Sequence, residues 1–226
     1  MNLIKGVLLD VDGTLVDSND AHAHAYVDAL KEYGYDVSYE RVRPLIGMGG
    51  DKLLPEILGI AGDSGLRKEI DARRGDIFKA HYLPHVNAFP GVRELLERFL
   101  QDGLSLIASS SAKEDELAAL LELAKVDDLI GEQTSASDAE GSKPDPDVLE
   151  AALEKLALPP EAALLLGDTP YDVQAAAPLG LGVVALRCGG WADKDLAGAL
   201  AIYDDPHDLL VNYETSPFAR RGLRAG

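Results

Sequence analysis

The feature that most constrains this chain is an apolar run near its beginning that ends in two aspartates. Residues 7–14 read Val-Leu-Leu-Asp-Val-Asp-Gly-Thr. Residues two apart in a strand point to the same side, so the carboxylates of Asp10 and Asp12 can converge where this strand ends. Two like charges held close together are costly unless a cation or a proton offsets them, and Mg²⁺ prefers such oxygen ligands. A strand followed by an ordinary Asp-Gly turn explains the same residues, so the run alone leaves both interpretations open.

Apolar strands and amphipathic helices alternate in the second half of the chain. After a first strand at 4–9, the sequence predicts strands at 104–108, 163–166 and 182–186. The spacing of apolar residues predicts helices at 92–100, 114–123, 147–156 and 173–177. Strands rich in Leu and Val that are separated by helices indicate an α/β fold. We expect a doubly wound parallel sheet, a Rossmann-like core, with helices on both faces.

The segment from residue 18 to residue 86 has a different pattern. Its apolar residues have helical spacing, as in the run at 53–58, and it contains no convincing strand. Helices are expected from a polar cluster at 17–20 to about residue 32, and again at 66–80. We therefore predict an α/β core made of residues 1–17 and 87–226, and a smaller all-helical domain inserted at residues 18–86.

The chain is strongly acidic, with 39 Asp and Glu against 21 Lys and Arg and a formal net charge of −18. Such a surface repels nucleic acid and anionic membranes, so neither is expected as a partner. The single cysteine, Cys188, cannot form an intramolecular disulfide. Neither a signal peptide nor an apolar run of membrane-spanning length is evident. We expect a cytoplasmic protein that is a monomer or a weak homodimer.

Three further places near strand ends carry groups suited to phosphoryl chemistry. Ser109 follows the strand at 104–108, Lys143 precedes a proline, and Asp168 and Asp172 bracket the turn after the strand at 163–166. Taken singly, helix capping and a solvated loop lysine explain them. Together with the first aspartate pair they supply a carboxylate nucleophile, an acid–base group, donors for a phosphoryl group and oxygen ligands for a metal.

Four segments of the chain, in this order, resemble the four motifs of the haloacid dehalogenase superfamily. They are Asp10-Val11-Asp12-Gly13-Thr14, Ser109, Lys143-Pro144, and Gly167-Asp168-Thr169-Pro170-Tyr171-Asp172. The helical insertion is similar to the cap domain of the branch that contains phosphoglycolate phosphatases and β-phosphoglucomutases. The resemblance spans nearly the whole chain.

The resemblance implies a role for each motif residue. Asp10 would be the nucleophile and Asp12 the acid–base group. The groups that would hold Mg²⁺ are Asp10, the backbone carbonyl of Asp12, and Asp168, with Asp172 close by. The groups that would hold the phosphoryl group are Thr14, Ser109 and Lys143. Because three serines are adjacent at 109–111, Ser109 is chosen on the ground that it directly follows the apolar strand.

The helical insertion is expected to select the substrate. A glycine-rich turn at 47–52 can bring backbone N–H groups and Lys52 toward an anion, and Arg43 is a second candidate cation. A plain helix–helix turn with exposed charges explains these residues as well. His22, in the first helix of the insertion, is either a group of the closed site or an ordinary helix histidine.

The function that we predict is a Mg²⁺-dependent phosphatase for a small-molecule phosphate monoester, acting through an aspartyl-phosphate. A phosphomutase of the β-phosphoglucomutase type would use the same intermediate and remains the alternative. Asp12 argues against a dehalogenase or a phosphonate hydrolase, because those relatives do not use this second aspartate. The complete set of motifs argues against a non-catalytic binding module.

Overall fold

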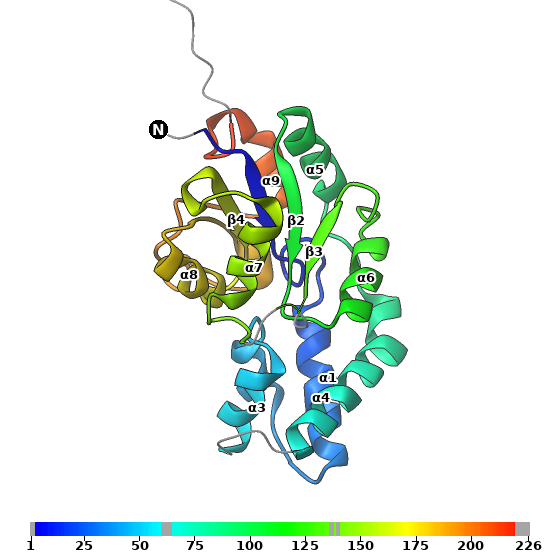
Figure 1. Ribbon diagram of the computed structural model, residues 1–226. Helices are drawn as coiled ribbons and strands as arrows, with labels where there is room; N and C mark the ends of the chain where they lie inside the picture. The colour runs from blue at the N-terminus through cyan, green and yellow to red at the C-terminus, as the bar shows by residue number, and fades with distance from the viewer. Residues whose placement is uncertain (1–2, 60–64, 136–137, 139–140, 220–226) are drawn as a thin grey trace, which may run out of the picture.

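The computed structural model describes residues 3–59, 65–135, 138 and 141–219. Its centre is a six-stranded sheet in the order β3-β2-β1-β4-β5-β6, and every neighbouring pair is parallel. The strands are β1 (Gly6–Leu9), β2 (Ser105–Ser109), β3 (Glu132–Thr134), β4 (Ala163–Gly167), β5 (Gly182–Leu186) and β6 (Ala201–Tyr203). The predicted α/β class with a parallel sheet is confirmed (Figure 1).

Helices cover both faces of this sheet. They are α5 (Val92–Gln101), α6 (Glu114–Leu123), α7 (Asp147–Leu156), α8 (Pro170–Ala176) and α9 (Pro206–Val211). Along β1 the side chains alternate between the two faces, as the pleat requires. Leu8 belongs to the apolar cluster that includes α7 and α8 residues, and its neighbours Val7 and Leu9 belong to the cluster that includes α5 residues. All three leucine and valine side chains are fully buried, so β1 is the central strand of the core.

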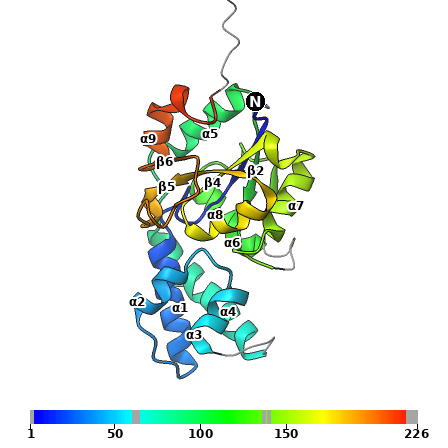
Figure 2. The same cartoon turned by 90° about the vertical axis from the view of Figure 1, so that its left-hand side faces the viewer.

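The segment after β1 forms a block of helices at the carboxyl edge of the sheet (Figures 1 and 2). Its described α-helices are α1 (Asn19–Glu32), α2 (Tyr39–Val42), α3 (Gly50–Leu58) and α4 (Gly65–Ile77), and a π-helical stretch at Phe78–Tyr82 continues α4. The two connections to the sheet pair with each other, since Asp17 N–H donates to Asn87 O (2.9 Å) and Phe89 N–H donates to Leu15 O (3.0 Å). The division of the chain into two domains at these connections stays a prediction.

The predicted strands and most predicted helices agree with the structure to within a residue or two at their ends. The helix predicted at 173–177 begins earlier, at Pro170, because Thr169 caps it: Thr169 Oγ1 accepts from Asp172 N–H while Asp172 accepts from Thr169 N–H. The helix predicted at 66–80 runs from Gly65 to Ile77 before its hydrogen bonding changes to the π pattern. Strands β3 and β6, with three residues each, and α9 were not predicted.

Within the described ranges, no helix combines the length and the hydropathy that a membrane span requires.

Leu8→Ala should lower the free energy of unfolding by about 2–5 kcal/mol, because it opens a cavity between the sheet and α7. Leu8 is 0% exposed, whereas Leu200 is 61% exposed. The matched variant Leu200→Ala should therefore stay within about 0.5 kcal/mol of the wild type in urea denaturation. Equal effects of the two substitutions would contradict the assignment of β1 to the core.

Candidate active site

The predicted motif residues meet at the carboxyl edge of the sheet. Asp10 directly follows β1, Ser109 is the last residue of β2, and Asp168 directly follows β4. Because β1 lies between β2 and β4, these three strand ends are neighbours. Lys143 comes from the loop before α7, and Asp172 from the first turn of α8. In an open α/β sheet this edge is where ligands bind.

A buried lysine joins two of the carboxylates. Lys143 is 1% exposed, and its Nζ lies 2.5 Å from Asp10 Oδ1 and 2.6 Å from Asp172 Oδ1. Burial raises the pKa of Asp10 to about 7, with the charge of Asp172 adding to the effect and Lys143 opposing it. Burial also acts to lower the pKa of Lys143, but the two carboxylates outweigh it and the pKa stays above its ordinary value. The ammonium is therefore charged at neutral pH.

A third carboxylate completes an acidic triad. Asp10, Asp168 and Asp172 are all buried, and each offers an oxygen within 4.8 Å of the others. Burial, together with the charges of Asp10 and Asp172, raises the pKa of Asp168 well above its ordinary value. Thr14 Oγ1 lies 3.0 Å from both Asp10 Oδ2 and Asp168 Oδ1. One hydroxyl proton satisfies only one of these oxygens, so the other needs a proton or a cation.

The triad fits a divalent cation. One lysine offsets only one of three carboxylate charges, and the remaining repulsion adds to burial in raising the pKa values of Asp10 and Asp168. The donor set consists of oxygens alone, which hard cations such as Mg²⁺ prefer. Asn19 Nδ2 donates to the other carboxylate oxygen of Asp168, Oδ2, at 2.8 Å and fixes its position. These residues could hold the metal that the resemblance implies.

Asp12 faces the helical block. Its Oδ1 accepts from Ser18 Oγ (2.5 Å) and lies 2.7 Å from His22 Nε2. Burial acts to raise the pKa of Asp12, but His22 and the hydrogen bond from Ser18 outweigh it and hold the pKa below its ordinary value. Asp12 is thus a charged acceptor, in an environment distinct from that of Asp10.

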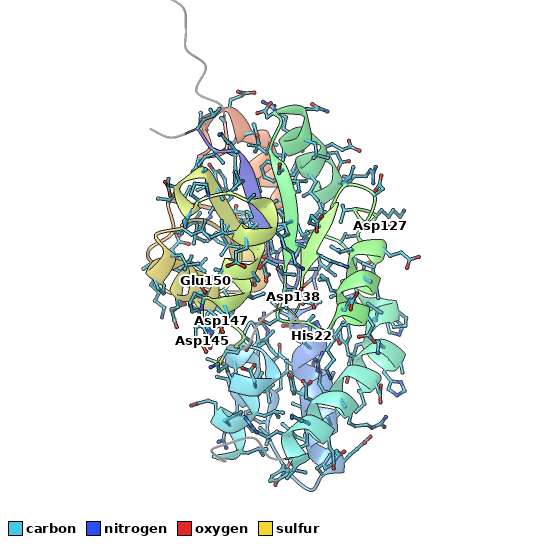
Figure 3. The ribbon with its side chains drawn as sticks, viewed as in Figure 1. His22, Asp127, Asp138, Asp145, Asp147 and Glu150 are labelled. Atoms are coloured by element: carbon cyan, nitrogen blue, oxygen red, sulfur yellow. The ribbon has the colours of Figure 1, made fainter. Side chains whose placement is uncertain are left out.

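His22 is buried and contacts an ion pair that joins the helical block to the sheet-bearing part. Its ring stacks on Phe78, with centroids 3.9 Å apart, and Figure 3 shows it at the end of α1 that faces the sheet. Arg74 Nη1, from α4, lies 3.4 Å from His22 Nδ1 and donates to both carboxylate oxygens of Glu116, at 2.8 and 2.9 Å. Glu116 belongs to α6 of the sheet-bearing part, and both members of the pair are buried.

Sequence reasoning missed Arg74 and Glu116. Each is an ordinary charged residue of a helix, and no spacing or motif distinguishes it from the other charged residues nearby. Only the packing of α4 against α6 brings the two side chains together.

Ser109 carries an unsatisfied hydroxyl. The residue is 0% exposed, and its Oγ has no hydrogen-bond partner among the described residues. Its backbone carbonyl accepts from Lys143 Nζ at 3.3 Å, so the residue lies beside the buried ion pair. A buried polar group without a partner is costly, and a bound anion would satisfy it.

A cavity of about 250 Å³ lies between the sheet edge and the helical block. Asp10, Asp12 and Lys113 line it from one side, and Tyr26, Asp71, Arg74 and the loop at 46–50 line it from the other. Such a volume suits a small molecule. The cavity therefore joins the motif residues to the helical block.

The two cations predicted for the block, Arg43 and Lys52, are not among the residues that line this cavity. Arg43 donates to Asp20 Oδ1 (2.6 Å) and to the carbonyl of Gly189 (2.7 Å), and Lys52 pairs with Asp145. These contacts hold the segment that carries Arg43 and Lys52 against a backbone carbonyl and against carboxylates near the surface. Their predicted role in substrate selection stays a prediction.

The glycines of the same loop allow it to approach the sheet edge closely. Gly47 has a φ of 108°, and a Cβ there would lie 2.7 Å from Thr169 Cγ2. A Cβ on Gly49 would lie 2.5 Å from Ser142 Oγ, which accepts from Gly49 N–H at 3.1 Å. Tyr171 OH donates to the carbonyl of Pro44 at 2.6 Å. The loop is thus packed on the segments that carry Lys143 and Asp168.

Comparisons with known proteins give consistent results. Residues 7–186 match the family described as haloacid dehalogenase-like hydrolase. The phosphoglycolate phosphatase of Rhodospirillum rubrum is 31% identical over 212 residues, which cover 89% of this chain and 87% of that protein. A hydrolase from Pseudomonas syringae superposes with a TM-score of 0.87 at 28% identity, covering 93% of this chain and 98% of that one. β-Phosphoglucomutase from Clostridium difficile shares the fold, with a TM-score of 0.82 at 17% identity over 94% and 96% of the chains.

The acidic triad predicts a specific pattern of stability. Mg²⁺ at about 100 times its dissociation constant should add about 2.7 kcal/mol to the free energy of unfolding of the wild type. Asp168→Asn removes one of the like charges, so at pH 8 the metal-free variant should be at least as stable as the metal-free wild type and should gain little from Mg²⁺. Thermal unfolding with and without Mg²⁺ measures both effects, and Asp36→Asn, in an exposed loop, is the control.

The same triad fixes the sign of the pH dependence without metal. The folded-state pKa of Asp10 is about 7, above the value in the unfolded chain, so the folded state binds more protons between these values. Metal-free protein should therefore become more stable as the pH falls from 8 to 6. A loss of stability over that interval, or an undiminished gain from Mg²⁺ in Asp168→Asn, would contradict the triad.

Proposed function

Because this chain belongs to the haloacid dehalogenase-like hydrolases, we propose that it is a Mg²⁺-dependent phosphatase that cleaves a small phosphate monoester at Asp10. The family match confirms the resemblance found in the four motifs. The observation that carries the proposal is the buried cluster at the sheet edge, where a carboxylate with a pKa of about 7 touches a charged lysine. A charged nucleophile, a fixed cation and a free buried hydroxyl within one site suit an in-line attack on phosphorus.

In the first step, a carboxylate oxygen of Asp10 attacks the phosphorus atom and the bond to the leaving oxygen breaks. Asp12, which is charged in the free site, takes up a proton when the substrate binds and gives it to that leaving oxygen, and the product alcohol departs. In the second step, water attacks the phosphorus of the aspartyl-phosphate while Asp12 takes its proton. The bond to Asp10 then breaks, which releases inorganic phosphate and restores both carboxyl groups.

Three other side chains orient the phosphoryl group. Lys143 offsets the charge of Asp10 and can donate to a phosphoryl oxygen, so the two anions meet beside a common cation. The free hydroxyl of Ser109 gains a partner when a phosphoryl oxygen binds beside it. Thr14 bridges Asp10 and Asp168 and fixes the position of both. When bound, Mg²⁺ would supply charge neutralisation for the phosphoryl oxygens, held by Asp10, the backbone carbonyl of Asp12 and Asp168, with Asp172 beside them.

The helical block supports the acid–base group. His22 and Ser18 both contact Asp12 Oδ1, which directs this carboxylate toward the boundary between the block and the sheet. The leaving oxygen of a substrate bound at Asp10 would lie toward that boundary, since the cavity extends from Asp10 into the block. Asp12 is therefore suited to exchange a proton with the leaving group and with water.

Asp10→Asn tests the nucleophile. The substitution keeps the size of the side chain but removes the attacking charge, so phosphate release should fall to below about a thousandth of the wild-type rate, the scale set by loss of a covalent catalyst. Phosphate release from p-nitrophenyl phosphate with Mg²⁺ is the measurement. Asp36→Asn is the control and should retain wild-type activity. A pure Asp10→Asn sample with a few per cent of wild-type turnover would refute the assignment.

Asp12→Asn tests the acid–base role by its dependence on the leaving group. Alkoxides are poor leaving groups and need a proton, so kcat for an alkyl phosphate should fall by about 10²–10⁴-fold. An aryl oxide leaves more readily, so formation of the aspartyl-phosphate from p-nitrophenyl phosphate in the first turnover should fall much less. Rapid-quench measurement of the first turnover separates the two steps. Equal losses for both esters would assign Asp12 a different role.

A further inference from the structure

The part of the cavity beyond the two catalytic aspartates contains more carboxylates than cations. The described residues that line it include the cations Arg74 and Lys113 and the carboxylates Asp51, Asp71 and Glu116. These five groups surround the space that the leaving group of a phosphate monoester bound at Asp10 would occupy. Their charges sum to one net negative charge, which opposes a second anionic group in the substrate.

Both of these cations are already paired with carboxylates. Arg74 donates to Glu116 at 2.8 and 2.9 Å, lies 3.5 Å from Asp71 Oδ1, and is 6% exposed. Lys113 Nζ lies 2.8 Å from Asp71 Oδ2. A carboxylate in the leaving group would have to share Lys113 with Asp71, which would weaken the compensation of a largely buried aspartate and bring two like charges together.

The two cations of the helical block that the sequence suggested for anion binding lie outside the cavity. Arg43 is bound to Asp20 and to the carbonyl of Gly189, and Lys52 to Asp145. Lys143 stands at the phosphoryl end, where Asp10 and Asp172 already hold it. The phosphoryl end therefore combines a buried ammonium with carboxylates that could hold a metal, and the described residues of the leaving-group end offer neither.

The same lining suits hydroxyl groups. Asp71 takes hydrogen bonds from Tyr26, at 3.2 Å, and Lys113, and its carboxylate retains further lone pairs. Ser111 lines the cavity, and its buried Oγ has no partner among the described residues. An alcohol hydroxyl can donate to a carboxylate and accept from a serine or a lysine, whereas a carboxylate can only accept.

We propose that the leaving group of the natural substrate is a small, uncharged alcohol that carries at least one further hydroxyl, and that Asp71 sets this preference by holding Lys113. The proposal rests on the proposed phosphatase function and adds the chemical class of the substrate. Asp71 is a specificity-determining residue in this assignment, because it pairs with Lys113, the one partly exposed cation among the described residues of the lining.

The test compares three esters that share a two-carbon chain and differ in charge: 2-phosphoglycolate, 2-hydroxyethyl phosphate and 2-aminoethyl phosphate. Phosphate release with Mg²⁺ gives kcat/KM for each. We expect 2-hydroxyethyl phosphate to exceed 2-phosphoglycolate by about tenfold or more, since each tenfold step corresponds to about 1.4 kcal/mol. The aminoethyl ester should not exceed the hydroxyethyl ester, because Asp71 and Glu116 are already paired with Lys113 and Arg74 and Asp51 accepts from Ser142.

Asp71→Asn supplies the matched variant. It keeps the size of the side chain and releases Lys113, so the ratio of kcat/KM for 2-phosphoglycolate to that for 2-hydroxyethyl phosphate should rise by about tenfold. Asp145→Asn releases Lys52 outside the cavity and should leave that ratio unchanged. The wild-type ratio alone decides the preference if Asp71→Asn does not fold.

The outcomes separate this inference from the phosphatase proposal. Failure to hydrolyse any ester, p-nitrophenyl phosphate included, would overturn the phosphatase function itself. Three results would overturn only the assignment of the leaving group. They are a kcat/KM for 2-phosphoglycolate that equals or exceeds that for 2-hydroxyethyl phosphate, a highest kcat/KM for the aminoethyl ester, and activity on the aryl ester alone. An unchanged ratio in folded Asp71→Asn would remove Asp71 as its determinant.

Discussion

The structure depends on one electrostatic constraint, the confinement of three carboxylates within a buried volume that contains a single ammonium. Asp10, Asp168 and Asp172 approach one another within 4.8 Å, and Lys143 touches two of them. Such an arrangement opposes folding unless the backbone imposes it and a cation relieves it. The parallel sheet imposes it, because β1 and β4 are hydrogen-bonded neighbours and deliver Asp10 and Asp168 to one edge. The core of buried Leu and Val side chains around these strands supplies the stabilisation that holds the charges together.

A second set of charges fixes the helical block against this edge. Arg74 and Glu116 form a buried ion pair between α4 and α6, and Arg74 also reaches the ring of His22. Buried ion pairs add little net stability, but they penalise every arrangement in which one partner is left alone. The pair therefore favours the position of the block in which His22 contacts Asp12. Through these contacts, the packing of two helices determines the surroundings of the acid–base group.

The sequence predicted the strands that have continuous apolar runs and the site residues that lie next to one another along the chain. Continuous apolar runs predicted β1, β2, β4 and β5, and the aspartate pair after β1 was visible because strand geometry alone brings its carboxylates together. Strands β3 and β6 have three residues each and partly exposed faces, so their patterns are too short to distinguish from loops. The partners of Arg43, Lys52 and Arg74 depend on how helices pack, which no local pattern encodes. For the same reason the cavity lining, and with it the cations that face a substrate, became visible only in three dimensions.

This acidic protein has to bind an anionic substrate, and the two ends of the cavity differ in the charges that they present to it. A net charge of −18 repels phosphate esters at long range, so attraction has to arise locally. At the phosphoryl end, carboxylates exceed ammonium groups, and this excess suits a metal that binds together with the phosphoryl group. At the leaving-group end, Arg74 and Lys113 are already paired with Glu116 and Asp71, so little attraction for charge remains. A site of this kind distinguishes substrates by the number of anionic groups they carry, because only one such group meets a buried ammonium beside carboxylates that could hold a metal.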